Sequence, residues 1–275
     1  VQMDSATALA AYQEGKVQMI HNIVDADVVA TARELSIAGT ANIGNHLDSG
    51  YAFLAFACEK KPLSDVNVRR AIAMCVDRAA FTETVYRGNA MPVYAYYSYA
   101  QWMLETTQDI LATFDPGFDV ESARALLERA GYTYNEDGKP FEPGKGQVRC
   151  KLQNGVLTPL RLSWAKTQSK PADLLKEQLT AAFDRLGIAL TIDEMSFSDM
   201  LTQYYRESGE RTYDLYFLSE MFPYQFDPYY AYQTGDEWQG AYNTSGLKDD
   251  RLLRAAQTMR RVPGGDTAAY LPKWL

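Results

Sequence analysis

The chain has 275 residues, of which 47% are hydrophobic and 23% are charged, a composition typical of a folded globular protein and far from that of a disordered one. Its 27 basic residues are outnumbered by 35 acidic ones, and the resulting net charge of −8 argues against a surface that binds nucleic acid. No 18 apolar residues follow one another, so we expect no membrane-spanning helix.

The first third of the chain alternates between helical and extended patterns. Asp25 and Asp65 each precede a segment with helical periodicity and are candidate N-caps, and Gly15 ends an earlier helical segment that begins at Asp4. We expect helices at residues 4–14, 26–35, 66–76 and 78–86, and short apolar strands at residues 17–20 and 51–58.

The rest of the chain continues this alternation. Asp119 and Gly131 enclose an amphipathic segment, Gly187 ends the longest one, and Asp137-Gly138 is a hairpin signal. We expect helices at residues 119–130, 170–186, 198–206, 249–261 and from 267 onward, strands at residues 160–165, 188–192 and 213–218, and a hairpin over residues 132–146. Strands separated by helices predict a mixed α/β fold, a mixed sheet flanked by helices, with ligand sites at the strand-end loops.

Motifs for catalysis, nucleotide binding and metal binding are missing from the sequence. It contains no G-x-S-x-G, no G-x-x-x-x-G-K-[ST], no G-x-G-x-x-G and no H-E-x-x-H. Its three cysteines have no C-x-x-C spacing, and His21 and His46 have no clustered third ligand. We therefore expect a protein that is not an enzyme and has no cofactor and no metal. The enzyme alternative is a glycosidase that uses Glu220 and Asp227, whose carboxyls would have to lie roughly 5 to 9.5 Å apart.

Aromatic residues are concentrated in two segments. The chain has 19 tyrosines, and eleven aromatic residues lie between Tyr213 and Tyr242, with five more between Tyr94 and Trp102. Rings with polar tips suit a cleft that binds a small organic ligand. The alternative is that these rings fill a local core or a domain interface.

The most specific pattern lies at residues 61–78, which read K-P-L-S-D-V-N-V-R-R-A-I-A-M-C-V-D-R. This segment resembles the signature of the family 5 extracellular solute-binding proteins, the oligopeptide-, dipeptide- and nickel-binding components of ABC importers. Cys75 takes the place of the alanine that is usual there. Since Asp65 caps the helix and Val68 and Ile72 pack it inward, the pattern is a signature of the fold and not of the binding site.

Three further stretches agree with the family in order and spacing. Gly15-Lys16-Val17 lies in a G-x-v-D element in which Gln18 replaces the usual acidic residue, and residues 87–92 resemble the turn that follows the signature. Residues 213–253 resemble the family's yDl, DP, N and D-x-l-l run. The resemblance thus covers nearly the whole chain.

The resemblance implies a lobe of the periplasmic-binding-protein type II-like fold. Family members are about twice this long and consist of two lobes around a cleft. Residues 1–58 would be the end of the first lobe plus a hinge strand, residues 59–262 the second, C-terminal lobe, and residues 263–275 the start of a return segment. The chain would carry one half of a binding site, and we expect weak binding or none by this half alone.

The function implied by the resemblance is that of a substrate-binding component. Such a protein binds a peptide or a similar small solute between lobes that close by hinge bending, and delivers it to an ABC permease of the membrane. We expect a monomer that is extracytoplasmic, periplasmic or at the cell surface and lipid-anchored at full length, and that has no nucleic-acid partner. The alternatives are a sensory or interaction module with the same fold, and a receptor for a sugar or a metal chelate.

The ligand-binding residues that the resemblance implies come from the two aromatic segments. They are Tyr96, Tyr97, Trp102, Glu220, Met221, Phe222, Tyr224, Phe226, Asp227 and Asn243. Short-peptide binders of the family hold the peptide's amino group with an acidic residue in the loop before Asp-Pro. Here that loop contains Tyr224 and Phe226, so a longer peptide, an aromatic ligand or a sugar stays open beside a dipeptide.

Overall fold

The structure is a computed structural model that describes residues 4–207, 209, 211–223 and 226–275. It divides into two compact units, one formed by residues 1–48 and 78–92 and the other by residues 49–77 and 93–275. No helix in the described part of the chain is long and apolar enough to cross a membrane.

The smaller unit consists of three helices, α1 (Ser5–Gln13), α2 (Ala26–Ile37) and α4 (Arg78–Tyr86). The predicted cap at Asp25 is confirmed, because its carboxylate accepts from the backbone N–H of Val28. Asp4, predicted as the first residue of its helix, is instead the N-cap and accepts from the backbone N–H of Thr7. Arg87, just after α4, pairs with Asp27 of α2 at 2.8 Å and so joins the two segments of this unit.

The strand predicted at residues 17–20 is wrong. These residues have no regular structure, and the backbone N–H groups of Lys16 and Val17 donate to the carbonyl of Ala11 at the end of α1. A strand needs a hydrogen-bonded neighbour, and the described residues of this unit contain no other strand to supply one.

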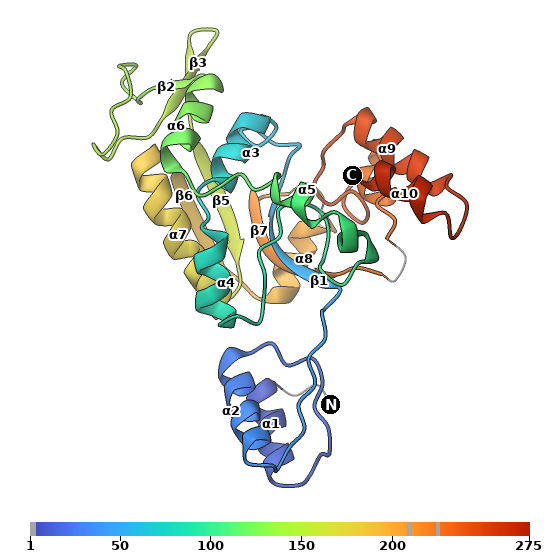
Figure 1. Ribbon diagram of the computed structural model, residues 1–275. Coiled ribbons are helices and arrows are strands. Elements are labelled where there is room, and N and C mark those ends of the chain that lie inside the picture. Colours follow the sequence, from blue (N-terminus) through green and yellow to red (C-terminus); the bar gives the residue numbers. More distant parts are fainter. Residues whose placement is uncertain (1–3, 208, 210, 224–225) are drawn as a thin grey trace. The chain divides into compact units, whose positions relative to one another are not determined.

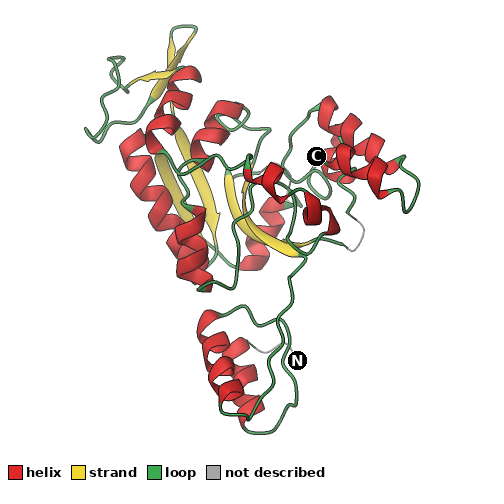
Figure 2. Ribbon diagram, viewed as in Figure 1, coloured by secondary structure: helices red, strands yellow, loops and turns green. Residues whose placement is uncertain are grey.

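The larger unit is built around a four-stranded mixed sheet in the order β1-β7-β5-β6 (Figures 1 and 2). The strands are β1 (Gly50–Phe56), β5 (Arg161–Lys166), β6 (Ala189–Glu194) and β7 (Leu215–Met221). β5 runs parallel to β6 and to β7, whereas β1 is antiparallel to β7. The mixed α/β architecture predicted from the sequence is confirmed.

Helices cover both faces of this sheet. α7 (Lys170–Leu186) connects β5 to β6, and α8 (Phe197–Tyr204) connects β6 back to β7 on the other side of β5. Because such connections are right-handed, the two helices lie on opposite faces. On the α8 face, Met200 and Tyr204 pack with Ala165 and Tyr216 of the sheet.

The helix that carries the family-like signature is α3 (Val66–Ala73), which packs against α6 (Val120–Arg129). Asp65 caps α3 by accepting from the N–H of Asn67, and Val68 and Ile72 are fully buried. The helix ends three residues earlier than predicted, where the N–H of Cys75 donates to Ile72. As expected, this segment stabilises the fold.

A second, three-stranded sheet consists of β2 (Tyr132–Tyr134), β3 (Cys150–Gln153) and β4 (Val156–Pro159). The turn predicted at Asp137-Gly138 is present, with a bridge between Tyr134 and Pro140, but β2 pairs mainly with β3. The β3–β4 hairpin was not predicted, although Asn154-Gly155, with φ of 50° and 79°, is a typical hairpin turn.

Short helices complete the larger unit. They are η1 (Trp102–Thr106), α5 (Gln108–Ala112), η2 (Tyr230–Tyr232), η3 (Asp236–Trp238), α9 (Asp250–Arg260) and α10 (Thr267–Trp274). α10 packs on the segment that precedes α5, where Trp274 contacts a small core of Tyr97, Leu104 and Leu111.

The N-cap of α9 makes the stability of the larger unit depend on pH. Hydrogen bonds from the side chain and the backbone N–H of Arg251 lower the pKa of Asp249 from 3.8 to about 2. Since the folded pKa is depressed, this contribution is complete above pH 3.8 and is lost as the pH falls through about 2. Asp249→Asn keeps a capping oxygen but does not titrate, so we expect a shallower loss of stability between pH 4 and pH 2 in denaturant unfolding; an unchanged slope would contradict this.

Candidate functional site

Five aromatic rings gather where β1 begins and β7 ends. We call Tyr51, Phe53, Tyr96, Phe222 and Phe226 the aromatic cluster. The Tyr51 ring stacks on those of Phe222 and Phe53, with centroid distances of 5.1 and 4.8 Å. Tyr96 meets Phe222 edge-on at 5.0 Å and lies 5.4 Å from Phe226, which in turn lies 5.6 Å from Phe222. Such pairs are favourable beyond their buried area.

The sheet positions these rings. Side chains alternate along a strand, so Tyr51 and Phe53 of β1 point to the same face. The antiparallel register places Tyr51 opposite Glu220 and Phe53 opposite Leu218 on β7. The N–H of Phe222 donates to the carbonyl of Ser49 at 3.0 Å, which extends the pairing beyond β7 and holds Phe222 over the start of β1.

Glu220 is the carboxylate of this site. β7 extends to Met221, three residues further than predicted, so Glu220 and Met221 lie on a strand and not in the loop after it. Desolvation raises the pKa of Glu220, although its side chain stays accessible. No salt bridge or hydrogen bond of the Glu220 side chain occurs among the described residues. Burial, together with the negative charge of Glu220, also raises the pKa of Tyr51 and of Tyr96.

Of the residues implied by the resemblance, the structure brings Tyr96, Glu220, Phe222 and Phe226 together. Met221 follows Glu220 but points to the opposite face of the sheet, where its side chain is exposed. Tyr224 lies outside the described residues. A direct ligand contact by any of these residues stays a prediction.

Tyr97 and Trp102 lie apart from the aromatic cluster. The Tyr97 side chain is 2% exposed and packs on Leu104, Leu111 and Trp274, and burial raises its pKa to about 12. Trp102 is 44% exposed, with its ring 5.7 Å from that of Tyr270. Tyr97 therefore has a core position, while Trp102 presents its ring at the surface.

Asp227 and Asn243 are engaged by their own surroundings. Asp227 pairs with Arg260 of α9 at 2.9 Å and accepts from the N–H of Tyr229. Asn243 is fully buried, donates to the carbonyls of Gln233 and Leu247, and accepts from Ser245 and Gly246. These contacts give both residues a role in holding their loop.

Sequence reasoning missed Tyr51 and Phe53. A buried strand was predicted at residues 51–58, and the structure has a mostly half-buried one at Gly50–Phe56. The position of its rings beside Phe222 and Phe226 depends on the pairing of β1 with β7. The available signal is the alternation of aromatic residues in Tyr51-Ala52-Phe53, which puts two rings on one face.

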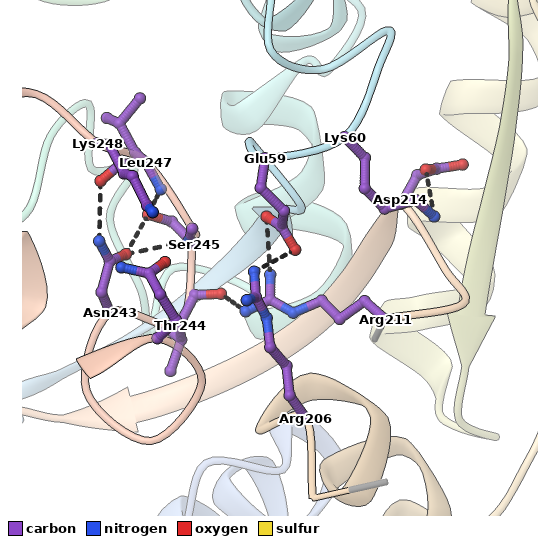
Figure 3. A network of polar contacts seen from close by, with 12 residues as sticks. Glu59, Lys60, Arg206, Arg211, Asp214, Asn243, Thr244, Ser245, Leu247 and Lys248 are labelled. Atoms are coloured by element: carbon purple, nitrogen blue, oxygen red, sulfur yellow. Dashed lines mark hydrogen bonds and ion pairs between the residues drawn. The ribbon is translucent and has the colours of Figure 1, made fainter. Parts of the chain in front are cut away.

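The opposite end of the β1–β7 pair carries a charged network (Figure 3). The Glu59 carboxylate lies 2.5 Å from Arg206 and 3.7 Å from Arg211, and Arg211 also donates to the carbonyl of Thr244. Arg211 is fully buried, and desolvation lowers its pKa. The network joins the segment after β1, the segment after α8 and the loop around Thr244.

The aromatic cluster offers stacked rings and one accessible carboxylate. Asp227 forms an ion pair with Arg260. The glycosidase alternative would use this carboxylate together with that of Glu220. Within the described part of the chain, no three His, Cys, Asp or Glu side chains are grouped so that they could hold a metal ion. Stacked rings beside an accessible carboxylate are suited to contact a small organic ligand.

Known protein structures share this fold. The chain superimposes on the oligopeptide-binding protein AppA from Bacillus subtilis, solved with a nonapeptide, with a TM-score of 0.74 and 16% identity over 98% of this chain and 49% of that one. NikA from Brucella suis, solved with Fe(III)-EDTA, gives a TM-score of 0.68 and 18% identity over 98% and 50% of the two chains. These neighbours confirm the periplasmic-binding-protein type II-like fold.

Sequence comparison leads to the same group of proteins. The chain is 29% identical over 129 residues to the dipeptide-binding protein of Escherichia coli, a match that covers 46% of this chain and 22% of that protein. It is 28% identical over 139 residues to heme-binding protein A of Haemophilus influenzae, over 47% and 22% of the two proteins. The matched region thus spans less than a quarter of either relative. The model of the bacterial extracellular solute-binding proteins, family 5, matches residues 1–242, and the chain belongs to this family.

Proposed function

We propose that this chain is part of the substrate-binding component of an ABC importer, and that it binds a peptide or a similar small solute and delivers it to a membrane permease. The observation that carries the proposal is the aromatic cluster beside Glu220, at the carboxyl end of β7. Ligands of open α/β sheets bind outside the carboxyl ends of the strands. Family membership and the peptide-binding relatives support this function.

In this proposal the ligand lies in a cleft between two lobes that close by hinge bending, and the aromatic cluster contributes to one wall. Residues 1–58 would end the first lobe and include the hinge strand, residues 59–262 would form the second lobe, and residues 263–275 would begin the return segment. The full-length protein would be a monomer outside the cytoplasm, held by a lipid anchor, without catalytic activity, cofactor or nucleic-acid partner.

A peptide is the first ligand class to test because several relatives are peptide-binding proteins. The E. coli relative is named for dipeptides, and AppA was solved with a nonapeptide. Metal chelates are the second ligand class to test, because one relative is named heme-binding protein A and NikA was solved with Fe(III)-EDTA. A sugar, or use of the fold as a sensory module without a permease, is the remaining alternative.

The test measures ligand binding by variants of the full-length protein in which one ring of the aromatic cluster is replaced by alanine. We expect Tyr96→Ala and Phe226→Ala each to raise the Kd for a bound peptide about 3- to 10-fold, since a ring contact contributes about 0.5–1.5 kcal/mol. Both side chains are half-buried, so the fold should tolerate the change. Calorimetric titration with peptides found by a thermal-shift screen measures the effect.

A matched control is Phe118→Ala, which removes a 55% exposed ring outside the aromatic cluster and should leave the Kd unchanged. Equal affinity of Tyr96→Ala, Phe226→Ala and the unaltered protein would show that the ligand binds elsewhere. Binding of sugars or metal chelates with no response to any peptide would keep the receptor function and reject the peptide.

A further inference from the structure

The tip of the β3–β4 hairpin combines an asparagine with a glycine. Asn154 and Gly155 form the whole connection between the two strands, because Gln153 at the end of β3 lies opposite Val156 at the start of β4. Asn154 is the only asparagine of the sequence that is followed by glycine. Every other asparagine precedes a residue whose side chain shields the next backbone nitrogen.

This turn is open to solvent and packs against nothing. Asn154 and Gly155 are both exposed, and a Cβ atom at Gly155 would have no other atom within 4 Å. Among the described residues, neither the backbone N–H of Gly155 nor the side-chain amide of Asn154 makes a hydrogen bond. No contact in the described structure therefore holds the amide of Asn154 away from the nitrogen of Gly155.

The other turn and the other asparagines of this unit differ in this respect. At Asp137-Gly138, the N–H of Gly138 donates to the carbonyl of Asn135 at 3.0 Å. Asn135 and Asn243 are buried, and the side-chain oxygen of each accepts two hydrogen bonds. Such bonds fix an amide in place, so these positions are protected by the fold.

An exposed amide beside a free backbone nitrogen can cyclise. The nitrogen of Gly155, after losing its proton to hydroxide, attacks Cγ of Asn154, and the amide nitrogen takes a proton from water and leaves as ammonia. Water then opens the succinimide ring. Attack at the side-chain carbonyl gives aspartate, whereas attack at the backbone carbonyl gives isoaspartate, in which the main chain runs through Cβ. Solvent water is the only co-reactant.

We propose that Asn154 is a site of spontaneous deamidation, and that its isoaspartate product separates β4 from the second sheet. Isoaspartate adds a carbon to the main chain between the paired residues Gln153 and Val156, so the geometry of a two-residue hairpin turn is lost. β4 is the outer strand in the order β2-β3-β4 and pairs with β3 alone in the described part of the chain. Aspartate tolerates the left-handed conformation of Asn154, with φ of 50°, and keeps the turn.

The experiment incubates the full-length protein at mildly alkaline pH, once folded and once unfolded in guanidinium chloride, and follows each asparagine by mass spectrometry of its peptides. We expect Asn154 to convert in the folded protein at a rate within several-fold of that in the unfolded chain, because the open turn offers little protection. The internal control is Asn45, which is also exposed but precedes His46 and should convert many times more slowly. Asn154→Gln should show no product at this position, since its ring would be larger and closes slowly.

Hydrogen exchange measures the structural consequence. In the isoaspartate form, isolated by chromatography, the amides of β4 should lose protection. Those of the four-stranded sheet should keep it, because the two sheets share no strand. Asn154→Asp is the matched control for the added charge: it carries a carboxylate on an ordinary main chain and should leave β4 protected.

Three results would contradict the proposal. Conversion of Asn154 only after unfolding would show that the fold protects the turn. Equal rates at Asn154 and Asn45 would show that the Asn-Gly turn is not a special site. Isoaspartate at position 154 with unchanged exchange of β4 would overturn the structural consequence.

Discussion

Replacing Arg211 with methionine is expected to lower the free energy of unfolding by about 3 kcal/mol, as does the loss of one partner from a buried ion pair. The Arg211 side chain is fully buried, lies 3.7 Å from the Glu59 carboxylate and donates to the carbonyl of Thr244. Its guanidinium also lies over the ring of Tyr204 at 5.6 Å. Methionine keeps most of the volume but none of these polar contacts. Urea unfolding of the full-length protein measures the change.

The matched control for this prediction is Arg251→Met. Arg251 pairs with Asp249 at 3.1 Å, but its side chain is 85% exposed, and exposed pairs contribute at most about 1 kcal/mol. The two variants remove the same group, so the difference between them reports burial. If Arg211→Met proved no more destabilising than Arg251→Met, the network around Glu59 would not stabilise the fold as we infer.

Gly246→Ala is expected to destabilise the protein by a similar amount, about 3 kcal/mol. The backbone of Gly246 has a φ of +69°, which costs an L-residue about 1–2 kcal/mol. A Cβ atom there would overlap the Glu59 carboxylate and lie 2.9 Å from Nη2 of Arg206. Since Glu59 is held by Arg206 at 2.5 Å, the carboxylate cannot move aside without breaking that pair. A thermal melt followed by circular dichroism measures the loss.

Gly117→Ala is the control that separates the cost of the backbone conformation from the cost of the overlap with Glu59. Gly117 has nearly the same backbone conformation, with a φ of +70°, but no atom within 4 Å of the position that a Cβ would take. Gly117→Ala should therefore lower the free energy of unfolding only by the cost of a positive φ for an L-residue, about 1–2 kcal/mol. A Gly246→Ala variant as stable as Gly117→Ala would mean that the Glu59 network adjusts without cost.

The candidate site could be predicted in part. Phe222, Phe226 and Tyr96 lie in the two segments dense in aromatic residues and were implied as ligand-binding residues by the family resemblance, and the structure brings the three rings together. Tyr51 was missed because its strand was assigned to the core and nothing local shows which strand pairs with it. Glu220 was expected in a loop, because nothing in residues 219–221 shows that they pair with residues 50–52.

The helices and the fold signature were determined by the sequence itself. The caps of Asp4, Asp25 and Asp65 act on backbone N–H groups two or three residues away, and Gly187 ends α7 with a φ of +71°. Such interactions are local, so the residue types that make them can be read in order along the chain.

The site was decided only by the tertiary structure. Tyr51 and Glu220 become neighbours through the β1–β7 register, which joins segments more than 150 residues apart, and a shift of one residue would move either side chain to the other face of the sheet. The Glu59 network likewise joins three distant segments. Sequence periodicity shows which face of a strand is apolar, but the partner of that face is set by the packing of the whole sheet, and this packing places an accessible carboxylate beside a cluster of rings.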